Sequence, residues 1–152
     1  MFKRIMVGID GSHAAIGALA EAIRVGESES ATVRAVSVVE PVADTITRCS
    51  GSGHPVAVAR SLRDAAQAAL ARACDLFVLT GVTGEPSLID AGDSDVASVL
   101  FRESRTWGAD LVVLGTHGRR GIERSCSAVP PKRSSESPLF LYWSFRLGRA
   151  QS

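Results

Sequence analysis

Two glycine-containing turns carry the residues of this chain that are best suited to bind a ligand. The first turn has the sequence GIDGS, from Gly8 to Ser12, and the second has the sequence GTHGRRG, from Gly115 to Gly121. Glycines let the second backbone come close to a ligand, while its amides, its hydroxyl and its two arginines suit a polyphosphate. The Asp10 carboxylate of the first turn can accept hydrogen bonds from a ribose or from the amine of an adenine. Together the two turns suggest a nucleotide site.

Each of these residues also has a purely structural interpretation. Asp10 could cap a turn or a helix, and Gly115 and Gly118 could serve turn geometry alone. Neither turn is a Walker A loop, because GxxxxGK[ST] does not occur, and neither is the GxGxxG dinucleotide turn. His117 has no serine or cysteine nucleophile at a recognisable elbow, so we expect no catalytic role for it.

Composition narrows the class of protein. With 152 residues, 45% hydrophobic and 22% charged, the chain fits one ordinary globular domain. Its formal net charge of +1 gives no electrostatic reason to expect nucleic-acid binding. Three widely spaced cysteines, Cys49, Cys74 and Cys126, lack CxxC or histidine spacing, which favours free thiols over a metal site. We expect no bound metal.

The sequence also leads us to expect a cytoplasmic protein without membrane contact. The segment Met1 to Ile9 lacks the apolar run of about 7 to 15 residues that a signal peptide needs. No stretch approaches the roughly 20 apolar residues of a transmembrane helix.

The elements that must position the two turns alternate between strands and helices. Short apolar runs predict strands, and apolar residues at three- and four-residue spacing predict helices. Ser12 suits a helix N-cap, and Gly26 suits a helix stop. Consecutive apolar strands joined by helices predict an α/β fold, an open parallel sheet with helices on both faces. The predicted strands cover 2–9, 32–39, 76–82 and 110–114, and the predicted helices cover 13–25, 57–74 and 95–107.

The stretches VGIDGS and GADLVVLGTHGRRGIER, with the alternation between them, resemble the universal stress protein family over residues 1–124. The second stretch is the more specific of the two. The resemblance implies a Rossmann-like, adenine nucleotide alpha hydrolase-like fold with strand order 3-2-1-4-5. It also implies a homodimer and an ATP ligand, with Mg²⁺ as a possible companion.

Residue by residue, the resemblance makes Asp10 the carboxylate that contacts adenosine and Val38 an apolar wall of the base pocket. Gly115, His117 and Gly118 match the first half of the family's phosphate motif. The second half is a glycine followed by serine or threonine, but this chain has Ala128-Val129 at that place. The implied binding residues are Ile9, Asp10, Val38, Gly115, Thr116, His117 and Gly118.

The chain changes character after Arg124. Residues 125–152 are rich in serine, contain two adjacent prolines and show no helical periodicity. We therefore predict a domain over residues 1–124 and an atypical, poorly ordered tail over 125–152. The family's fifth strand would be absent or altered, which would leave the edge of the fourth strand exposed and Phe140 to Trp143 without a place to pack.

A shifted reading frame explains this change. With the third codon bases chosen among the synonymous ones, a back-translation of Ser125 to Ser144 that is read from the third base gives LLGSAAEAILRVSPVPVLV. That peptide contains the missing Gly-Ser pair, then a helix-forming segment and a buried-strand pattern. We hypothesise a frameshift after about Arg124, arising either from a mutation or from an error in the determined gene sequence.

The expected function is that of a stress-response protein that acts by binding, with an adenine-nucleotide site whose second phosphate-binding half is missing. We expect no enzyme activity beyond weak ATP hydrolysis. One alternative is an interaction module that binds no nucleotide. Another is a phosphate-ester hydrolase on the same fold, which would need a carboxylate cluster or a nucleophile beside Asp10.

Overall fold

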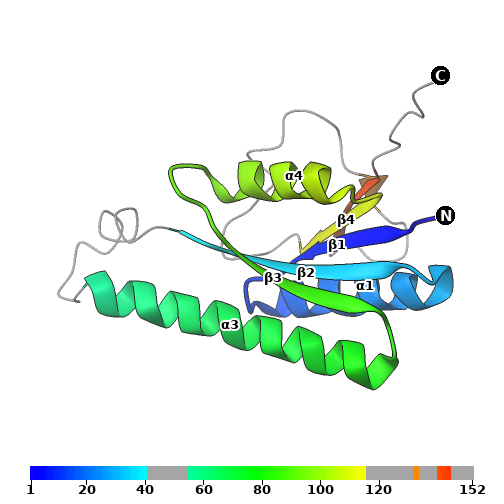
Figure 1. Ribbon diagram of the computed structural model, residues 1–152, viewed down its shortest axis with the longest axis horizontal. Coiled ribbons are helices and arrows are strands. Elements are labelled where there is room, and N and C mark those ends of the chain that lie inside the picture. Colours follow the sequence, from blue (N-terminus) through cyan, green and yellow to red (C-terminus); the bar gives the residue numbers. More distant parts are fainter. Residues whose placement is uncertain (41–54, 116–131, 134–139, 145–152) are drawn as a thin grey trace.

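The computed structural model describes residues 1–40, 55–115, 132–133 and 140–144, with side chains described for 1–40 and 56–115. Within these ranges the strands form one six-stranded sheet in the order β3-β2-β1-β4-β6-β5 (Figure 1). The strands β3, β2, β1 and β4 run parallel to one another. This part confirms the predicted α/β fold and the order 3-2-1-4. The strands are β1 (Arg4–Gly8), β2 (Thr32–Val39), β3 (Gly84–Asp90), β4 (Leu111–Gly115), β5 (Lys132–Arg133) and β6 (Phe140–Ser144).

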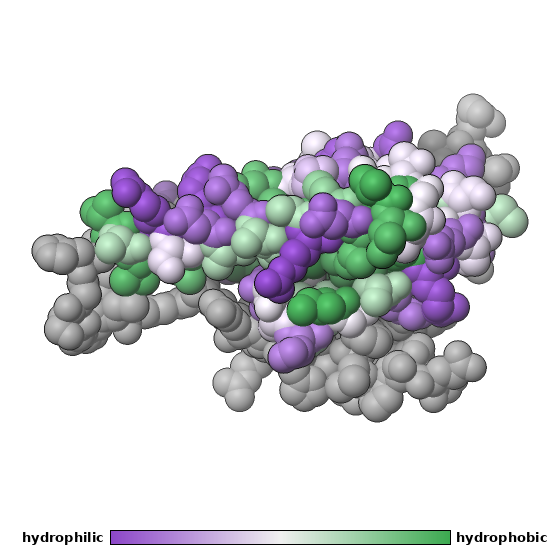
Figure 2. All heavy atoms as spheres, turned by 90° about the horizontal axis from the view of Figure 1, so that it is seen from below, coloured by the Kyte–Doolittle hydropathy of each residue, from purple (hydrophilic) through white to green (hydrophobic). Residues whose placement is uncertain are grey.

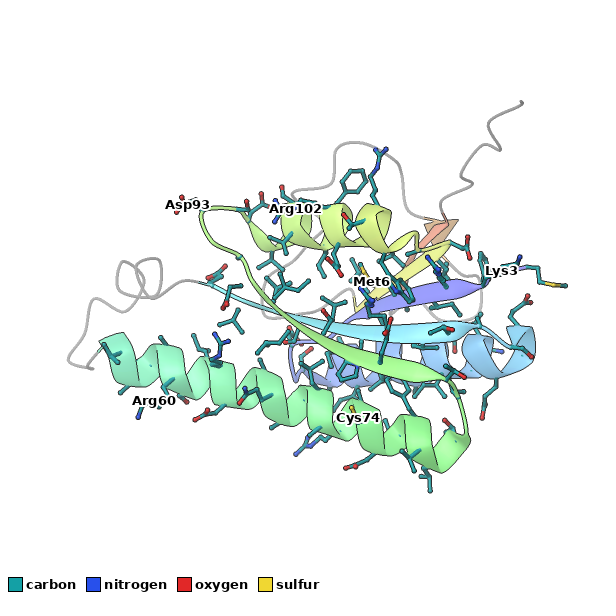
Figure 3. The ribbon with its side chains drawn as sticks, in the orientation of Figure 1. Lys3, Met6, Arg60, Cys74, Asp93 and Arg102 are labelled. Atoms are coloured by element: carbon teal, nitrogen blue, oxygen red, sulfur yellow. The ribbon has the colours of Figure 1, made fainter. Side chains whose placement is uncertain are left out.

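Helices cover both faces of the sheet, as predicted. The helices α1 (His13–Glu29) and α3 (Pro55–Thr80) lie on one face, and α4 (Val96–Trp107) lies on the other (Figure 1). One apolar cluster joins α1 and α3 to the sheet, and a second joins α4 to the opposite face, where Met6 points toward α4 (Figure 3). No described helix is both long and apolar enough to cross a membrane.

The strand next to β4 differs from the prediction. We expected the edge of β4 to be exposed, but β6 pairs with it, with Gly115 opposite Phe140 and Leu111 opposite Ser144. The pairing is antiparallel, so the family's fifth strand is altered in direction. The apolar segment at 140–144 has strand-forming residues, and pairing satisfies the backbone groups of β4 that an open edge would expose. Most of the predicted tail, 125–152, lies outside the described residues.

The predicted third strand over 76–82 is wrong, because α3 continues to Thr80. Its buried stripe includes Leu70, Ala73 and Phe77, at three- and four-residue spacing, while Val78 and Leu79 are 85% and 81% exposed. The third strand is β3, which begins at Gly84 and contains Pro86. Within the described sheet β3 pairs with β2 alone, and an edge strand tolerates a proline.

The predicted ends of the other helices are partly confirmed. Ser12 caps α1, because its Oγ accepts a hydrogen bond from Ala15 N at 3.2 Å. The predicted stop at Gly26 is wrong: α1 runs on to Glu29, and Ser30 ends it in the left-handed conformation. A β-carbon on Gly26 would lie 2.7 Å from Val33 Cγ2, so this glycine serves close packing between α1 and β2. Helix α4 is capped by Asp95 and ends at Gly108, close to the prediction.

Candidate functional site

A cleft lies at the carboxyl ends of β1, β2 and β4, where the connections to the helices begin. Its volume is about 160 Å³, smaller than the roughly 300 to 1,000 Å³ of drug-sized sites and closer to the size of a single ring system. In open parallel sheets, ligands bind at this edge because loops and helix N-termini converge there. The cleft is lined by Gly8, Ile9, Asp10, Ser12, Ala15, Val36, Ser37, Val38, Val39, Glu40, Leu62, Ala65, Ala66, Val96, Leu100, Leu114 and Gly115.

Asp10 stands at the mouth of this cleft, directly after β1. Its Oδ1 accepts a hydrogen bond from Ser12 N at 2.9 Å, and Ser12 in turn caps α1. The structural interpretation of Asp10 as a turn cap is therefore correct. A carboxylate has about four acceptor positions, so this bond is compatible with a further bond to a ligand hydroxyl. Asp10 both holds the turn and lines the cleft.

The apolar walls come from both faces of the sheet. Val38 and Ile9 line the cleft, and Ile9 N donates to Val36 O at 2.8 Å, which fixes the first turn against β2. On the α4 side, Leu100 and Leu114 complete the wall, and both are buried. A wall of this kind suits a flat, weakly polar ring.

Gly115 brings the second turn against the first helix. A β-carbon on Gly115 would lie 2.7 Å from the carbonyl carbon of Ala14 and 2.8 Å from its oxygen. Only glycine allows this approach without moving the backbone of α1. Of the remaining predicted binding residues, Thr116, His117 and Gly118 lie outside the described residues, as do Ala128 and Val129.

The cleft also has residues that the sequence patterns did not single out. Ser37 and Glu40 supply polar atoms from β2 and its end, and Leu62, Ala65 and Ala66 of α3 form a wall facing β2. A serine within the apolar strand VRAVSVV was the available signal for Ser37. The α3 residues carried no such signal, because they are ordinary helical alanines and a leucine that lie far in the sequence from both turns.

The charges of the described lining are acidic. Asp10 and Glu40 contribute carboxylates, and no described lining residue is a lysine or an arginine. Arg60 of α3 is exposed and points away from the sheet (Figure 3). Carboxylates at the mouth favour ligand groups that donate hydrogen bonds, such as hydroxyls and amines. Across the described ranges, no cluster of three or more His, Cys, Asp or Glu residues is arranged to hold a metal ion.

Comparison with known proteins gives a consistent result. A family model described as the universal stress protein family matches residues 1–127. A universal stress protein of Methanocaldococcus jannaschii is 27% identical over 124 residues, which cover 82% of this chain and 70% of that protein.

Solved structures agree on the fold. A protein of the universal stress protein family from Burkholderia pseudomallei is 30% identical, with a TM-score of 0.64, covering 76% of this chain and 82% of that one. A universal stress protein crystallised in complex with cAMP is 20% identical, with a TM-score of 0.54, covering 80% of this chain and 78% of that one. At 20% identity the second likeness concerns the fold alone.

Proposed function

Because this chain belongs to the universal stress protein family, we propose that it is a stress-response protein that acts by binding an adenine nucleotide. The proposed site is the cleft at the carboxyl ends of β1, β2 and β4. The observation that carries the proposal is the convergence of Asp10, Val38 and Gly115 on that one cleft, from three strands that are far apart in the sequence.

The chemistry of the lining supports the following place for each part of the ligand. The apolar walls at the carboxyl edge of the sheet, which come from both of its faces, receive the base. The Asp10 carboxylate accepts hydrogen bonds from ribose hydroxyls. The backbone at Gly115, which lacks a β-carbon, allows phosphate groups to approach the amides that follow β4.

Two nucleotides deserve to be tried first. ATP is the ligand that the family resemblance implies, with Mg²⁺ in the buffer. cAMP is the ligand of one universal stress protein of similar fold, and it carries a single phosphate charge. Since Ala128-Val129 replaces the Gly-Ser pair of the phosphate motif, we expect the nucleoside part to supply most of the binding energy in this chain.

Isothermal titration calorimetry of the full chain with ATP plus Mg²⁺, and separately with cAMP, tests the proposal. We expect saturable binding of at least one nucleotide with a Kd below about 1 mM. If neither binds more tightly than this, the proposal is wrong, and the chain is better regarded as an interaction module that uses no nucleotide. Phosphate release measured in the same samples reports whether bound ATP is hydrolysed.

A matched pair of variants places the binding in the cleft. Asp10→Asn keeps an oxygen that can accept from Ser12 N but removes the charge, so the turn should persist while hydrogen bonds to ribose weaken by about tenfold or more in Kd. Asp90→Asn is the control, because Asp90 is exposed and pairs with Arg63 at 3.0 Å away from the cleft lining. Equal effects of the two substitutions on Kd would show that Asp10 does not contact the ligand.

The homodimer is a prediction of the family resemblance, and the cytoplasmic location is a prediction from the sequence. We propose a homodimer that works in the cytoplasm, without a nucleic-acid partner. Size-exclusion chromatography with light scattering would measure the mass in solution and decide the first of these.

A further inference from the structure

Two serine side chains are buried in the described part of the chain, and they differ in one respect. Ser104 is 1% exposed, and its hydroxyl donates to Phe101 O at 2.7 Å within α4. Ser37, toward the carboxyl end of β2, is 2% exposed, and its hydroxyl has no hydrogen-bond partner among the described residues. Leaving a buried hydroxyl without a partner is unfavourable, and native proteins rarely do so without a reason.

The position of Ser37 supplies that reason. Side chains alternate along a strand, so Ser37 lies on the same face of the sheet as Val33 and Ala35, which pack in the cluster with α1 and α3. Ser37 also lines the cleft, together with Leu62 and Ala66 of α3. The hydroxyl is therefore a polar group in an apolar part of the cleft between β2 and α3.

The surroundings indicate which part of a ligand belongs there. Ribose hydroxyls are better placed at the mouth, beside the carboxylates of Asp10 and Glu40, which accept hydrogen bonds. The alanine and leucine side chains of α3 that line the cleft together with Ser37 give it an apolar wall, which suits a heterocyclic ring. A serine hydroxyl can both donate to a ring nitrogen and accept from an exocyclic amine.

We propose that Ser37 is a ligand-binding residue, whose hydroxyl hydrogen-bonds the heterocyclic base in the part of the cleft between β2 and α3. The proposal rests on the nucleotide-binding function proposed above and assigns the base end of that site. It adds a polar contact from the face of β2 opposite to Val38.

The test uses Ser37→Ala in the full chain, titrated with ATP and with adenosine. Loss of one hydrogen bond to the ligand should raise both Kd values by about tenfold, and by a similar factor, because both ligands carry the base. The melting temperature without ligand should stay within about 2 °C of the original or rise, because the substitution removes a hydroxyl that has no partner.

Ser104→Ala is the matched control, since it removes the other buried serine hydroxyl. It should lower the melting temperature by about 2 to 4 °C, because a hydrogen bond within α4 is lost, and it should leave both Kd values unchanged. A Ser37→Ala variant that behaves in the same way would show that its hydroxyl is satisfied within the protein or by a bound water, and would overturn the proposal. A Kd change with ATP but not with adenosine would overturn the assignment to the base.

Failure of this inference can be told apart from failure of the proposed function. If the unsubstituted chain binds ATP or adenosine and Ser37→Ala binds them equally well, only the role of Ser37 is wrong. If the unsubstituted chain binds neither ligand, the nucleotide site and the role of Ser37 fall together.

Discussion

The backbone of Ala14 lies directly against the α-carbon of Gly115, so that a β-carbon on Gly115 would come within 2.7 Å of the Ala14 carbonyl carbon. This contact joins the end of β4 to the first turn of α1. Gly115 belongs to the second glycine-containing turn, and Ala14 lies two residues after Ser12, the last residue of the first turn. The neighbouring atoms are backbone atoms and the β-carbon of Ala14, which cannot rotate away as a long, flexible side chain can.

Gly115→Ala is predicted to destabilise the protein by about 1 to 3 kcal/mol, because the added methyl group overpacks the contact with α1. Nucleotide affinity should fall as well, since α1 and β4 must separate at the edge of the cleft. Urea denaturation followed by circular dichroism measures the first effect and calorimetry the second. Unchanged stability would mean that the two elements are not packed as described.

Phe77 distinguishes the observed helix from the predicted strand over 76–82. It is 4% exposed and packs beneath Gly84, whereas Leu79 is largely exposed. Phe77→Ala should therefore cost about 3 to 5 kcal/mol, and Leu79→Ala should change stability by less than about 0.5 kcal/mol. In a strand these two residues would share a face, so comparable losses from both substitutions would contradict the helix.

Arg34 is held by three neighbours on the α4 side of the sheet. Its guanidinium lies 2.8 Å from Glu85 and 2.7 Å from Glu103, and it stacks 4.5 Å from the ring centroid of Trp107. Such a planar, stacked arrangement is specific to arginine, so Arg34→Lys should cost about 1 kcal/mol and Arg34→Met about 2 to 3 kcal/mol.

The exposed pair of Arg63 and Asp90 is the control for Arg34. Surface ion pairs contribute little, so Arg63→Met should change the free energy of unfolding by less than about 0.5 kcal/mol in the same denaturation experiment. Equal losses at both arginines would show that the contacts of Arg34 add nothing beyond a surface charge.

The cap of α4 should respond to pH. The Ser98 hydroxyl, at 2.6 Å, and the Ser98 amide, at 2.9 Å, donate to Asp95 and lower the pKa of its carboxyl below the ordinary value. A lowered pKa in the folded state means that the carboxylate stabilises the fold above its unfolded-state pKa, and that this contribution is lost as pH falls through the folded-state pKa.

Asp95→Ala should therefore lower the melting temperature at neutral pH, and the difference from the original chain should shrink in acid. Thermal unfolding at a series of pH values measures this difference. Asp93→Ala, an exposed neighbour in the preceding turn, serves as control and should show no such trend (Figure 3). A difference that stays constant down to the most acid pH would contradict the assigned role of the Asp95 charge.

The reading-frame hypothesis can be tested at the protein level. A chain in which the peptide LLGSAAEAILRVSPVPVLV replaces residues 126–144, so that its Gly-Ser pair falls at positions 128 and 129, should bind ATP about tenfold more tightly than the given chain, because it restores the phosphate-binding pair. Adenosine, which has no phosphate, should bind both chains equally. A restored chain whose Gly-Ser pair is replaced by two alanines is the control and should lose the gain. Equal ATP affinity of all three chains would show that the peptide from the shifted frame does not restore phosphate binding.

Some apolar residues of α3 are exposed on the surface of the protein. Figure 2 shows the face that α3 covers, where hydrophobic residues lie among hydrophilic ones. Val78 and Leu79 belong to this helix and are exposed, although they fall in the apolar run that suggested a strand. Apolar character alone therefore did not report burial in this segment.

Features that depend on a few neighbouring residues were predictable from the sequence. The cap at Ser12, the start of α4 and the strand over 32–39 follow from hydrogen bonds and spacing within one or two turns of chain. Asp10 and Val38 were identified because a family pattern marks their positions, and the cleft contains both. The family match itself extends over residues 1–127.

Features that depend on contacts between distant segments were decided by the tertiary structure. The run at 76–82 is compatible with a strand or a helix, and the packing of Phe77 beneath β3 selects the helix. The antiparallel partner of β4 comes from residues 140–144, more than twenty positions away, and pairing with it satisfies the backbone groups at the edge of β4. Ser37 and the α3 wall enter the cleft only because α3 packs across β2. Burial and proximity are properties of the packed chain, so no local pattern could show which of these side chains would meet a ligand.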